Sequence, residues 1–578
     1  MKYLSLLIAG MLALTSCKKF LDKTPLDRLT PEQAFSSESN LQLYSTSFYL
    51  MLPDGPGVYK GDGMTDITVP NAIPTYLAGK LSSLEATGWS WTSLRNINYF
   101  LERYDNPAIP LKARNHYGGI ARFFRAYFYF NMVKQFGDVP WYGKTLATDD
   151  SSLYKPRDPR MLVMDSVLAD INFACNNIYS TKDNGCTQIT KWVALALKSR
   201  ICLFEGTFRK YHPEFSLGST ANKWLTDAAD AADQVIKSAQ YKLQNTGAPE
   251  KDYRSLFTTE APVASEVLLA AVYNNALKKW HDAAWWFNSA TLGSRLGLSK
   301  NFVNTYLNAD GSRFTDIPGY DTMQFQVEVK NRDKRLQQTI RMGDYKRTDG
   351  TFAPPDFTVT YSGYQIQKFS LDDKYFDTRT ESYNSIPIIR YAEVLLNYAE
   401  AKADLGTLSV ADWNLTIGDL RNRAGIQNRT MPITVDAFMK NNFFPGISDA
   451  ALIEIRRERG VELASEGYRY DDLKRWKAGK LLERPYDGIY VPGKDILLDL
   501  NQDGKYDVSF VDKIPTTRVS GVVYFLLDNA TSKLSQGSKG NLIWLSNIPK
   551  TFDDKMYLYP IPFNDIVLNP ALKQNTGW

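Results

Sequence analysis

Long amphipathic segments dominate two parts of the chain. Apolar side chains recur at helical spacing, and short turns join neighbouring segments, over residues 81–104, 111–136, 159–179, 187–207, 222–238, 389–405 and 411–424. A further helix is expected from Thr30 to about residue 51, because Thr is a favoured N-cap and Pro31 suits the first helical position. Paired helices with short turns are typical of tetratricopeptide-like repeats, although the strict repeat signature is absent. The pattern predicts a mostly α-helical fold of stacked helical hairpins.

The pattern changes between the two helical parts. From residue 244 to residue 388 helical periodicity fades and Gly, Pro, Asn, Asp and aromatic residues rise, with one short helix expected near residues 299–307. The end of the chain is similar, and its clearest strand is expected at residues 522–527. We therefore expect a helical scaffold, a loop-rich insertion lobe with short strands and an irregular or β segment packed on the scaffold, at residues 31–243 with 389–477, residues 244–388 and residues 478–578, respectively.

The densest run of charge lies between Leu452 and Trp476 and also keeps an apolar stripe. Its spacing predicts two helices that are broken near Gly467. Glu454, Glu458 and Glu462 share one helical face, where like charges repel unless cations lie opposite. We interpret this stretch as a helix hairpin connected by ion pairs. A catalytic carboxylate site and a polar surface for a partner are the alternatives.

Composition excludes some classes of protein. The net charge of +5 comes from 68 basic and 63 acidic residues that are mixed throughout, whereas a nucleic-acid binder clusters its positive charge. The three His residues are scattered, and no metalloprotease, nucleotide-binding or nucleophile-elbow motif is present. The unusual feature is aromatic content, with 34 Tyr, 29 Phe and 12 Trp, which suits both packed helices and stacking platforms for sugars.

The first 17 residues have the pattern of a bacterial export signal. A cationic start precedes an apolar run at residues 4–14 that is too short to span a membrane, and small residues follow it. Leu14-Thr15-Ser16-Cys17 resembles a lipobox, which implies cleavage before Cys17 and lipidation of its thiol. Residues 18–30 then form a polar tether. We expect a protein anchored to the membrane by lipid and not embedded in it.

Several segments resemble the SusD/RagB family of nutrient-binding outer-membrane lipoproteins. They are the mature start CKKFLDKTPLDRLTPEQAF, the helix GGIARFFRAYFYFNMVKQFGDVPWY, the charged pair IRRERGVELASEGYRYDDLKRW and the end MYLYPIPFNDIVLNPALKQNTGW. The resemblance covers nearly the whole chain. It implies a helical-hairpin fold, oligosaccharide or polysaccharide as ligand, a SusC-like TonB-dependent transporter as partner and a position on the cell exterior. It implies no catalysis and no required cofactor; a surface glycoside hydrolase and a peptide-binding RagB-like lipoprotein are the alternatives.

Aromatic residues in the insertion lobe are the first candidate ligand site. Trp280, Trp285 and Trp286 fall within seven residues, and indole faces pack well against the C–H groups of sugar rings. Core packing is the alternative, and the two roles can be combined, with Trp280 and Trp285 in the core and Trp286 exposed. In the family the glycan site is an arc of aromatics on such loops. Further candidates on loops and helix ends are Trp89, Tyr76, Tyr320 and Tyr364.

A second candidate site lies in the C-terminal segment. Oxygen-bearing side chains stand at positions 1, 3, 5 and 9 of residues 499–507, and Gly504 stands at position 6. This spacing follows a calcium-binding loop. The last position should be Glu and is Phe510, and flanking helices are missing, so this is not a true EF-hand. The candidate ligands of a structural Ca²⁺ are Asp499, Asn501, Asp503, Lys505 and Asp507. The alternative is an Asx-turn hairpin between strands at residues 496–500 and 506–511.

The positions of the cysteines allow one disulfide bridge, which the sequence does not decide. Cys175 and Cys186 flank a turn between two expected helices, so a bridge between them is plausible in an oxidising compartment. Cys202 lies on an apolar helix stripe and is expected to be a buried free thiol.

Overall fold

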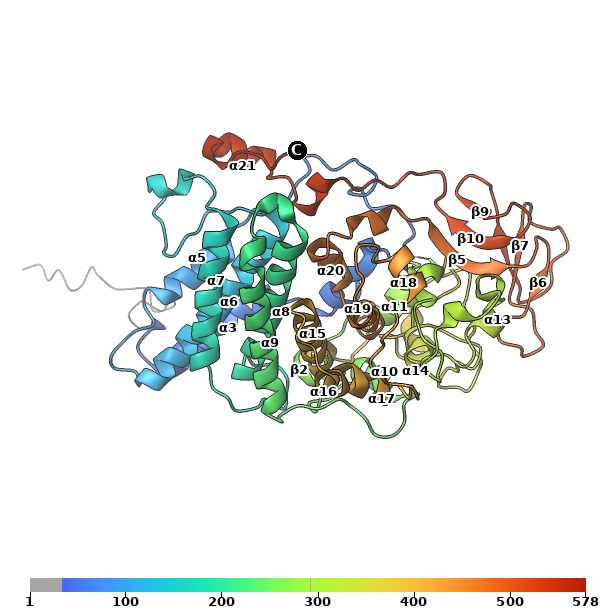
Figure 1. The fold of residues 1–578 in the computed structure, drawn as a ribbon, viewed down its shortest axis with the longest axis horizontal. Helices are drawn as coiled ribbons and strands as arrows, with labels where there is room; N and C mark the ends of the chain where they lie inside the picture. Colours follow the sequence, from blue (N-terminus) through green and yellow to red (C-terminus); the bar gives the residue numbers. More distant parts are fainter. Residues whose placement is uncertain (1–33, 292) are drawn as a thin grey trace, which may run out of the picture.

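The computed structural model describes residues 34–291 and 293–578, and most of its regular structure is helical. Figure 1 shows long helices stacked side by side at one end of the molecule and shorter helices, loops and small sheets at the other. The scaffold helices are α3 (Glu38–Thr46), α5 (Thr92–Leu101), α6 (Leu111–Phe136), α7 (Arg160–Asn177), α8 (Lys191–Tyr211), α9 (Ala221–Lys237), α15 (Tyr391–Asp404), α16 (Val410–Trp413), α17 (Asp419–Arg423), α18 (Ala437–Asn442), α19 (Ala450–Glu462) and α20 (Arg469–Arg475). In chain order α6 packs on α7, and α8 packs on α9, which also contacts α15. The predicted fold of stacked helical hairpins is confirmed.

Helix α6 has the bounds that its sequence predicts. Pro110 precedes the first residue, and Gly137 adopts a φ of +77°, which ends the helix. Two glycines in its middle let neighbours approach closely. A Cβ atom on Gly118 would lie 2.4 Å from the ring of Tyr104, and one on Gly119 would lie 2.9 Å from the side chain of Ile178. Side chains larger than hydrogen at these positions would therefore push α6 away from its neighbours.

One predicted helix start differs from the structure, and another lies outside the described residues. The helix expected from residue 81 begins only at Thr92, because Gly88 has a φ of +97° and the two tryptophans before Thr92 pack across α6 and the loop after it. The start signal at Thr30 lies outside the described residues. Within them α3 begins at Glu38, and its N-cap Ser37 accepts a hydrogen bond from the backbone N–H of Asn40.

The remaining elements are short. The other helices are α4 (Gly55–Tyr59), α10 (Asp252–Thr258), α11 (Ala283–Asn288), α12 (Lys300–Val303), α13 (Phe325–Glu328), α14 (Lys334–Thr339) and α21 (Phe563–Leu568). The strands are β1 (Thr68–Val69), β2 (Val267–Ala271), β3 (Gly297–Leu298), β4 (Ile386–Arg390), β5 (Tyr486–Val491), β6 (Leu497–Leu498), β7 (Val508–Val511), β8 (Val523–Leu526), β9 (Ser532–Leu534) and β10 (Gly540–Trp544). They form two-stranded sheets β1-β3 and β2-β4 and three-stranded sheets β5-β10-β9 and β6-β7-β8. Sheet β2-β4 joins the two ends of the insertion lobe directly before α15.

The charged stretch forms the helix pair α19–α20, and its charges are buried. Gly467, with a φ of +80°, lies in the break between the two helices. Glu458 lies 2.5 Å from Arg335 and 3.0 Å from Arg421. Glu462 also binds Arg335, at 2.8 Å. Arginines from other elements therefore supply the cations that the stacked glutamates need. Arg459 of α19 also pairs with Asp472 of α20 at 2.8 Å, which confirms the interpretation as a helix hairpin connected by ion pairs.

Candidate functional site

The predicted tryptophan cluster lies on α11 and directly before it. Trp285 and Trp286 are both half-buried on this helix. The Lys60 ammonium lies 4.0 Å from the centroid of the Trp286 ring and 2.7 Å from an Asp282 carboxylate oxygen. Lys60 thus covers part of one face of Trp286, and Asp282 holds it there. Trp280 precedes the helix, and its indole N–H donates to Asn275 Oδ1 at 3.1 Å.

His281 fixes the start of α11. Its Nδ1 accepts the backbone N–H of Ala283 at 3.2 Å, so Nε2 carries the proton and donates to the carbonyl oxygen of Asn384 at 2.8 Å. Burial lowers the pKa of His281 to about 4. The imidazole is therefore neutral at pH 7, and its two hydrogen bonds connect the helix of the tryptophans to the segment before β4.

Three distant segments meet beside α11. Strand β1 pairs antiparallel with β3, which brings the loop after β1 next to the segment that follows α11. Arg295 in that segment donates to the hydroxyl of Tyr361 at 2.6 Å and to the carbonyl of Ala290 at 2.8 Å. The ring of Tyr361 stacks on Trp544 at 3.7 Å between centroids and 9° between planes. The indole N–H of Trp544 donates to the carbonyl of Pro70 at 3.1 Å.

We call Trp286, Arg295, Tyr361 and Trp544 the aromatic arc. All four side chains are half-buried, so each leaves part of its surface open to a ligand. Flat aromatic faces favour the C–H surface of a sugar, and a guanidinium donates to hydroxyl oxygens. Sequence reasoning found Trp286 but missed the other three. Their contacts depend on pairing between segments that lie far apart in the chain, and no local pattern reports it.

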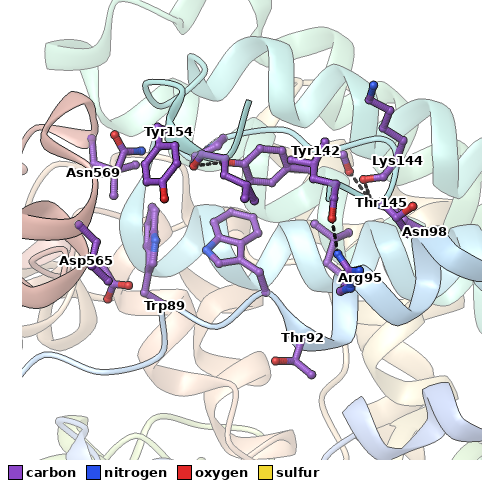
Figure 2. Close-up of a pocket in the computed structure, with 17 residues that line it drawn as sticks. Trp89, Thr92, Arg95, Asn98, Tyr142, Lys144, Thr145, Tyr154, Asp565 and Asn569 are labelled. Carbon is purple, nitrogen blue, oxygen red and sulfur yellow. Dashed lines mark hydrogen bonds between the residues drawn. The ribbon is translucent and has the colours of Figure 1, made fainter. Parts of the chain in front are cut away.

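Trp89 lies in a different place, in a cavity of about 410 Å³ between α5 and α21 (Figure 2). Trp89 and Trp91 meet edge to face at 5.4 Å, and Trp91 meets Tyr142 in the same way at 5.3 Å. Figure 1 shows α5 and α21 at the end of the molecule opposite the small sheets, whereas α11 lies nearer its middle. The predicted ligand-binding aromatics therefore do not form one site.

Two of the predicted ligand-binding tyrosines belong to the core. Tyr364 is fully buried, and its hydroxyl lies 2.9 Å from both carboxylate oxygens of Glu328. Tyr76 is 5% exposed, stacks on Tyr559 at 4.7 Å and donates its hydroxyl proton to the carbonyl of Met556. The prediction of a surface role is wrong for both residues, because contacts from distant segments cover them.

Tyr320 is half-buried on a short 3-10 turn. Its ring meets Phe314 at 5.9 Å and Phe438 at 6.2 Å, in both cases edge to face. These contacts attach the turn to α18, and they do not connect Tyr320 with the aromatic arc.

The candidate calcium loop is a hairpin between β6 and β7. Asp499 accepts the backbone N–H groups of Gln502 at 2.6 Å and Gly504 at 2.9 Å, and Asp507 accepts that of Leu500 at 2.7 Å. Burial, with the nearby acidic side chains, raises the pKa of Asp507 to about 6. In the part of the chain that the structure describes, no group of three or more His, Cys, Asp and Glu side chains is placed to hold a metal ion. The loop therefore forms the Asx-turn hairpin, and calcium binding stays a prediction.

The three described cysteines are free thiols. Cys175, Cys186 and Cys202 are buried, and the bridge considered between the first two is not formed. The thiol of Cys186 instead donates to the carbonyl of Val267 at 3.2 Å, which directs it toward β2 and away from a partner sulfur. Cys202 is a buried free thiol, as expected. Cys17 lies outside the described residues.

Acidic groups with raised pKa values bind backbone groups. Burial raises the pKa of Asp62 to about 7 and that of Asp487 to about 6. Asp62 accepts the backbone N–H groups of Gly467 and Arg469, and Asp487 accepts that of Asn301. These carboxylates connect segments of the fold, and the acids of α19 are paired with arginines. Among the described residues no helix is both long and apolar enough to cross a membrane.

Comparison with known proteins agrees with the fold. A model described as "SusD family" matches residues 288–578, and one described as "Starch-binding associating with outer membrane" matches residues 19–203. The SusD-like protein P38 of Formosa agariphila is 22% identical over 519 residues, which cover 84% of this chain and 93% of that protein. SusD-like protein P25 of the same organism is 24% identical over 539 residues, covering 85% and 89% of the two chains.

Solved structures show the same architecture. A SusD-like protein from Bacteroides fragilis superposes with a TM-score of 0.69 at 20% identity over 96% of this chain and all of that one. A second protein from that organism, described as a SusD-like carbohydrate-binding protein, gives a TM-score of 0.67 at 20% identity over 93% and 99%. One family model spans the carboxyl-terminal half, and the helical-hairpin architecture is shared along nearly the whole length. The chain belongs to the SusD family.

Proposed function

We propose that this protein binds oligosaccharide or polysaccharide at the outer surface of the cell without cleaving it. The observation that carries the proposal is that a hydrogen bond and ring stacking connect Arg295, Tyr361 and Trp544 close to the end of α11. It gives a partly exposed aromatic surface with hydrogen-bond donors, built on strand pairing rather than on a free loop. One matching family model is described as starch-binding and one solved relative as carbohydrate-binding, which supports the same ligand class.

We further propose that lipid attached to Cys17 anchors the protein to the outer membrane and that a SusC-like TonB-dependent transporter receives the glycan. The lipobox at residues 14–17 and the family support these two roles. Replacing Cys17 with Ser should release the protein from the membrane fraction; continued sedimentation with membranes would contradict the lipid anchor.

The ligand class is tested by a binding screen of the full chain. Affinity electrophoresis and calorimetry against plant, host and microbial polysaccharides and against peptide mixtures would be combined with analysis of released products. Binding to one glycan class without product supports the proposal. Binding to peptides alone, or release of shorter sugars, contradicts it and supports the peptide-binding or the hydrolase alternative, respectively.

A further inference from the structure

The cavity around Trp89 is separate from the aromatic arc and differs from it in chemistry. Its wall is formed by α5, by α21 and by the segment that follows α6 (Figure 2). The aromatic side chains that line it are Trp89, Trp91, Tyr142 and Tyr154. Its volume of about 410 Å³ lies in the range of small-molecule sites and suits a ligand of one or two sugar or amino-acid units. Tyr154 is 56% exposed, so the cavity opens to solvent beside it.

One carboxylate in this cavity has no partner. Asp565 lies in the first turn of α21, and Figure 2 shows it beside the indole of Trp89. Among the described residues its carboxylate has no hydrogen bond and no ion pair, and burial alone raises its pKa. By contrast, Asp158, which lies just before α7, binds the side chain of Lys155 and the backbone N–H of Trp141. An anion that is half-buried beside aromatic rings and not compensated within the protein favours a cation from outside.

The basic side chains of the cavity do not compensate Asp565. Arg95 and Lys144 lie at the far end of the cavity in Figure 2, beyond Tyr142. The guanidinium of Arg95 donates to the carbonyl of Leu146, and Lys144 is exposed. The negative charge is therefore localised at the end formed by Trp89, Tyr154 and Asp565.

We propose that this end of the cavity binds an organic cation, an ammonium or guanidinium group carried on a small body with an apolar face. The electron-rich faces of Trp and Tyr attract such a cation, and the carboxylate of Asp565 forms the ion pair. The apolar body then packs on Trp91 and Tyr142, whose rings continue the wall. The shared chemistry fits a sugar with a free amino group and the side chain of a basic amino acid, and the test separates these two sources.

The test is calorimetric titration of the full chain with D-glucosamine, L-lysine amide, L-arginine amide and the neutral sugars D-glucose and N-acetyl-D-glucosamine. We expect at least one cation to bind and both neutral sugars to bind at least about tenfold more weakly, because removal of the charge removes both the ion pair and the cation–π contact. If glucosamine binds more tightly, the ligand of the cavity is an amino sugar. If an amino-acid amide binds more tightly, the ligand is a basic residue of a peptide. Equal binding of charged and neutral sugars, or no binding of any cation, overturns the proposal.

Two variants locate the site. Asp565→Asn keeps the shape of the side chain and removes the charge, and Asp149→Asn removes a charge from an exposed position outside the cavity. Cation binding should fall about tenfold in D565N and stay unchanged in D149N. A Trp89→Phe variant provides a second measurement if D565N fails to fold, and it should weaken binding while the melting temperature stays close to that of the parent. Cation binding that is unchanged in folded D565N or W89F contradicts the assignment.

Discussion

Arg390 and Glu462 form an ion pair of 2.6 Å in which both side chains are almost completely excluded from solvent. Arg390 ends β4, and Glu462 ends α19, so the pair connects the sheet that closes the insertion lobe with the charged helix pair. Arg423 and Arg335 bind the same glutamate. The cations around Glu462 hold the pKa of its carboxyl far below its usual range, against the effect of burial.

Removing that carboxylate should destabilise the whole fold. Glu462→Gln removes the carboxylate that three buried guanidinium groups share, although each keeps at least one other carboxylate partner. Breaking a buried pair typically costs about 3–5 kcal/mol. Chemical denaturation would measure the loss in the free energy of unfolding. Glu483→Gln is the matched control, because Glu483 pairs with the exposed Lys480 at 2.8 Å and should matter little. Equal small effects of both substitutions would show that the buried network is not needed for stability.

The hydrogen bonds of His281 predict a dependence of stability on pH. The folded-state pKa is about 4 and the unfolded value is 6.5, so the folded protein binds fewer protons between these values. The contribution of the neutral imidazole is fully present above pH 6.5 and is lost as pH falls through about 4, a change on the order of 3 kcal/mol.

Thermal unfolding of the protein and of His281→Gln would be compared from pH 7 to pH 4. We expect the advantage of the parent over the variant to shrink as the pH falls, since only the parent must keep this imidazole unprotonated in order to fold. An advantage that is the same at both ends of the pH range would mean that His281 does not titrate as its burial requires.

The buried cysteines should be unreactive in the folded state. Burial raises the pKa of Cys175 to about 12 and that of Cys186 to about 11, so neither forms much thiolate at pH 8. A thiol reagent should label Cys175, Cys186 and Cys202 only after denaturation, and a reductant should leave the melting temperature unchanged. A melting temperature that falls with reductant would instead reveal a Cys175–Cys186 bridge.

The hairpin at Asp499 should keep its structure without calcium. The carboxylates of Asp499 and Asp507 already accept backbone N–H groups, so chelator should not change the melting temperature. Adding Ca²⁺ after chelation provides the control for any effect of the chelator itself. A melting temperature that falls with chelator and recovers with Ca²⁺ would assign these side chains as metal ligands.

Local signals predicted the scaffold well. Helix α6 begins after Pro110 and ends at Gly137 as expected, since proline and glycine act on the residues next to them. The charged stretch gave two helices, because its apolar and acidic positions repeat at helical spacing over several turns. These features depend on contacts between near neighbours in the sequence.

The surface aromatics were harder to predict. Tyr364 is covered because Glu328 lies against its hydroxyl, and the aromatic arc exists because β1 pairs with β3 and Trp544 reaches Pro70. A tyrosine in a loop-rich segment has the same local pattern whether such partners bury it or leave it exposed. Burial of a loop residue is decided by the tertiary structure, so sequence found the α11 cluster but not the residues that complete the surface.

The most direct measurement of the proposed function is affinity electrophoresis of the full chain and of Trp544→Ala in gels containing plant, host or microbial polysaccharide. Tyr375→Ala removes an exposed ring outside the arc and serves as the control. We predict that one glycan class retards the parent and Y375A, and that W544A, still folded by circular dichroism, binds about tenfold more weakly through the loss of ring stacking. Trp286→Ala should also weaken binding. Retardation that is equal in the parent, W544A and W286A, or absent for every glycan, would contradict glycan binding at the aromatic arc.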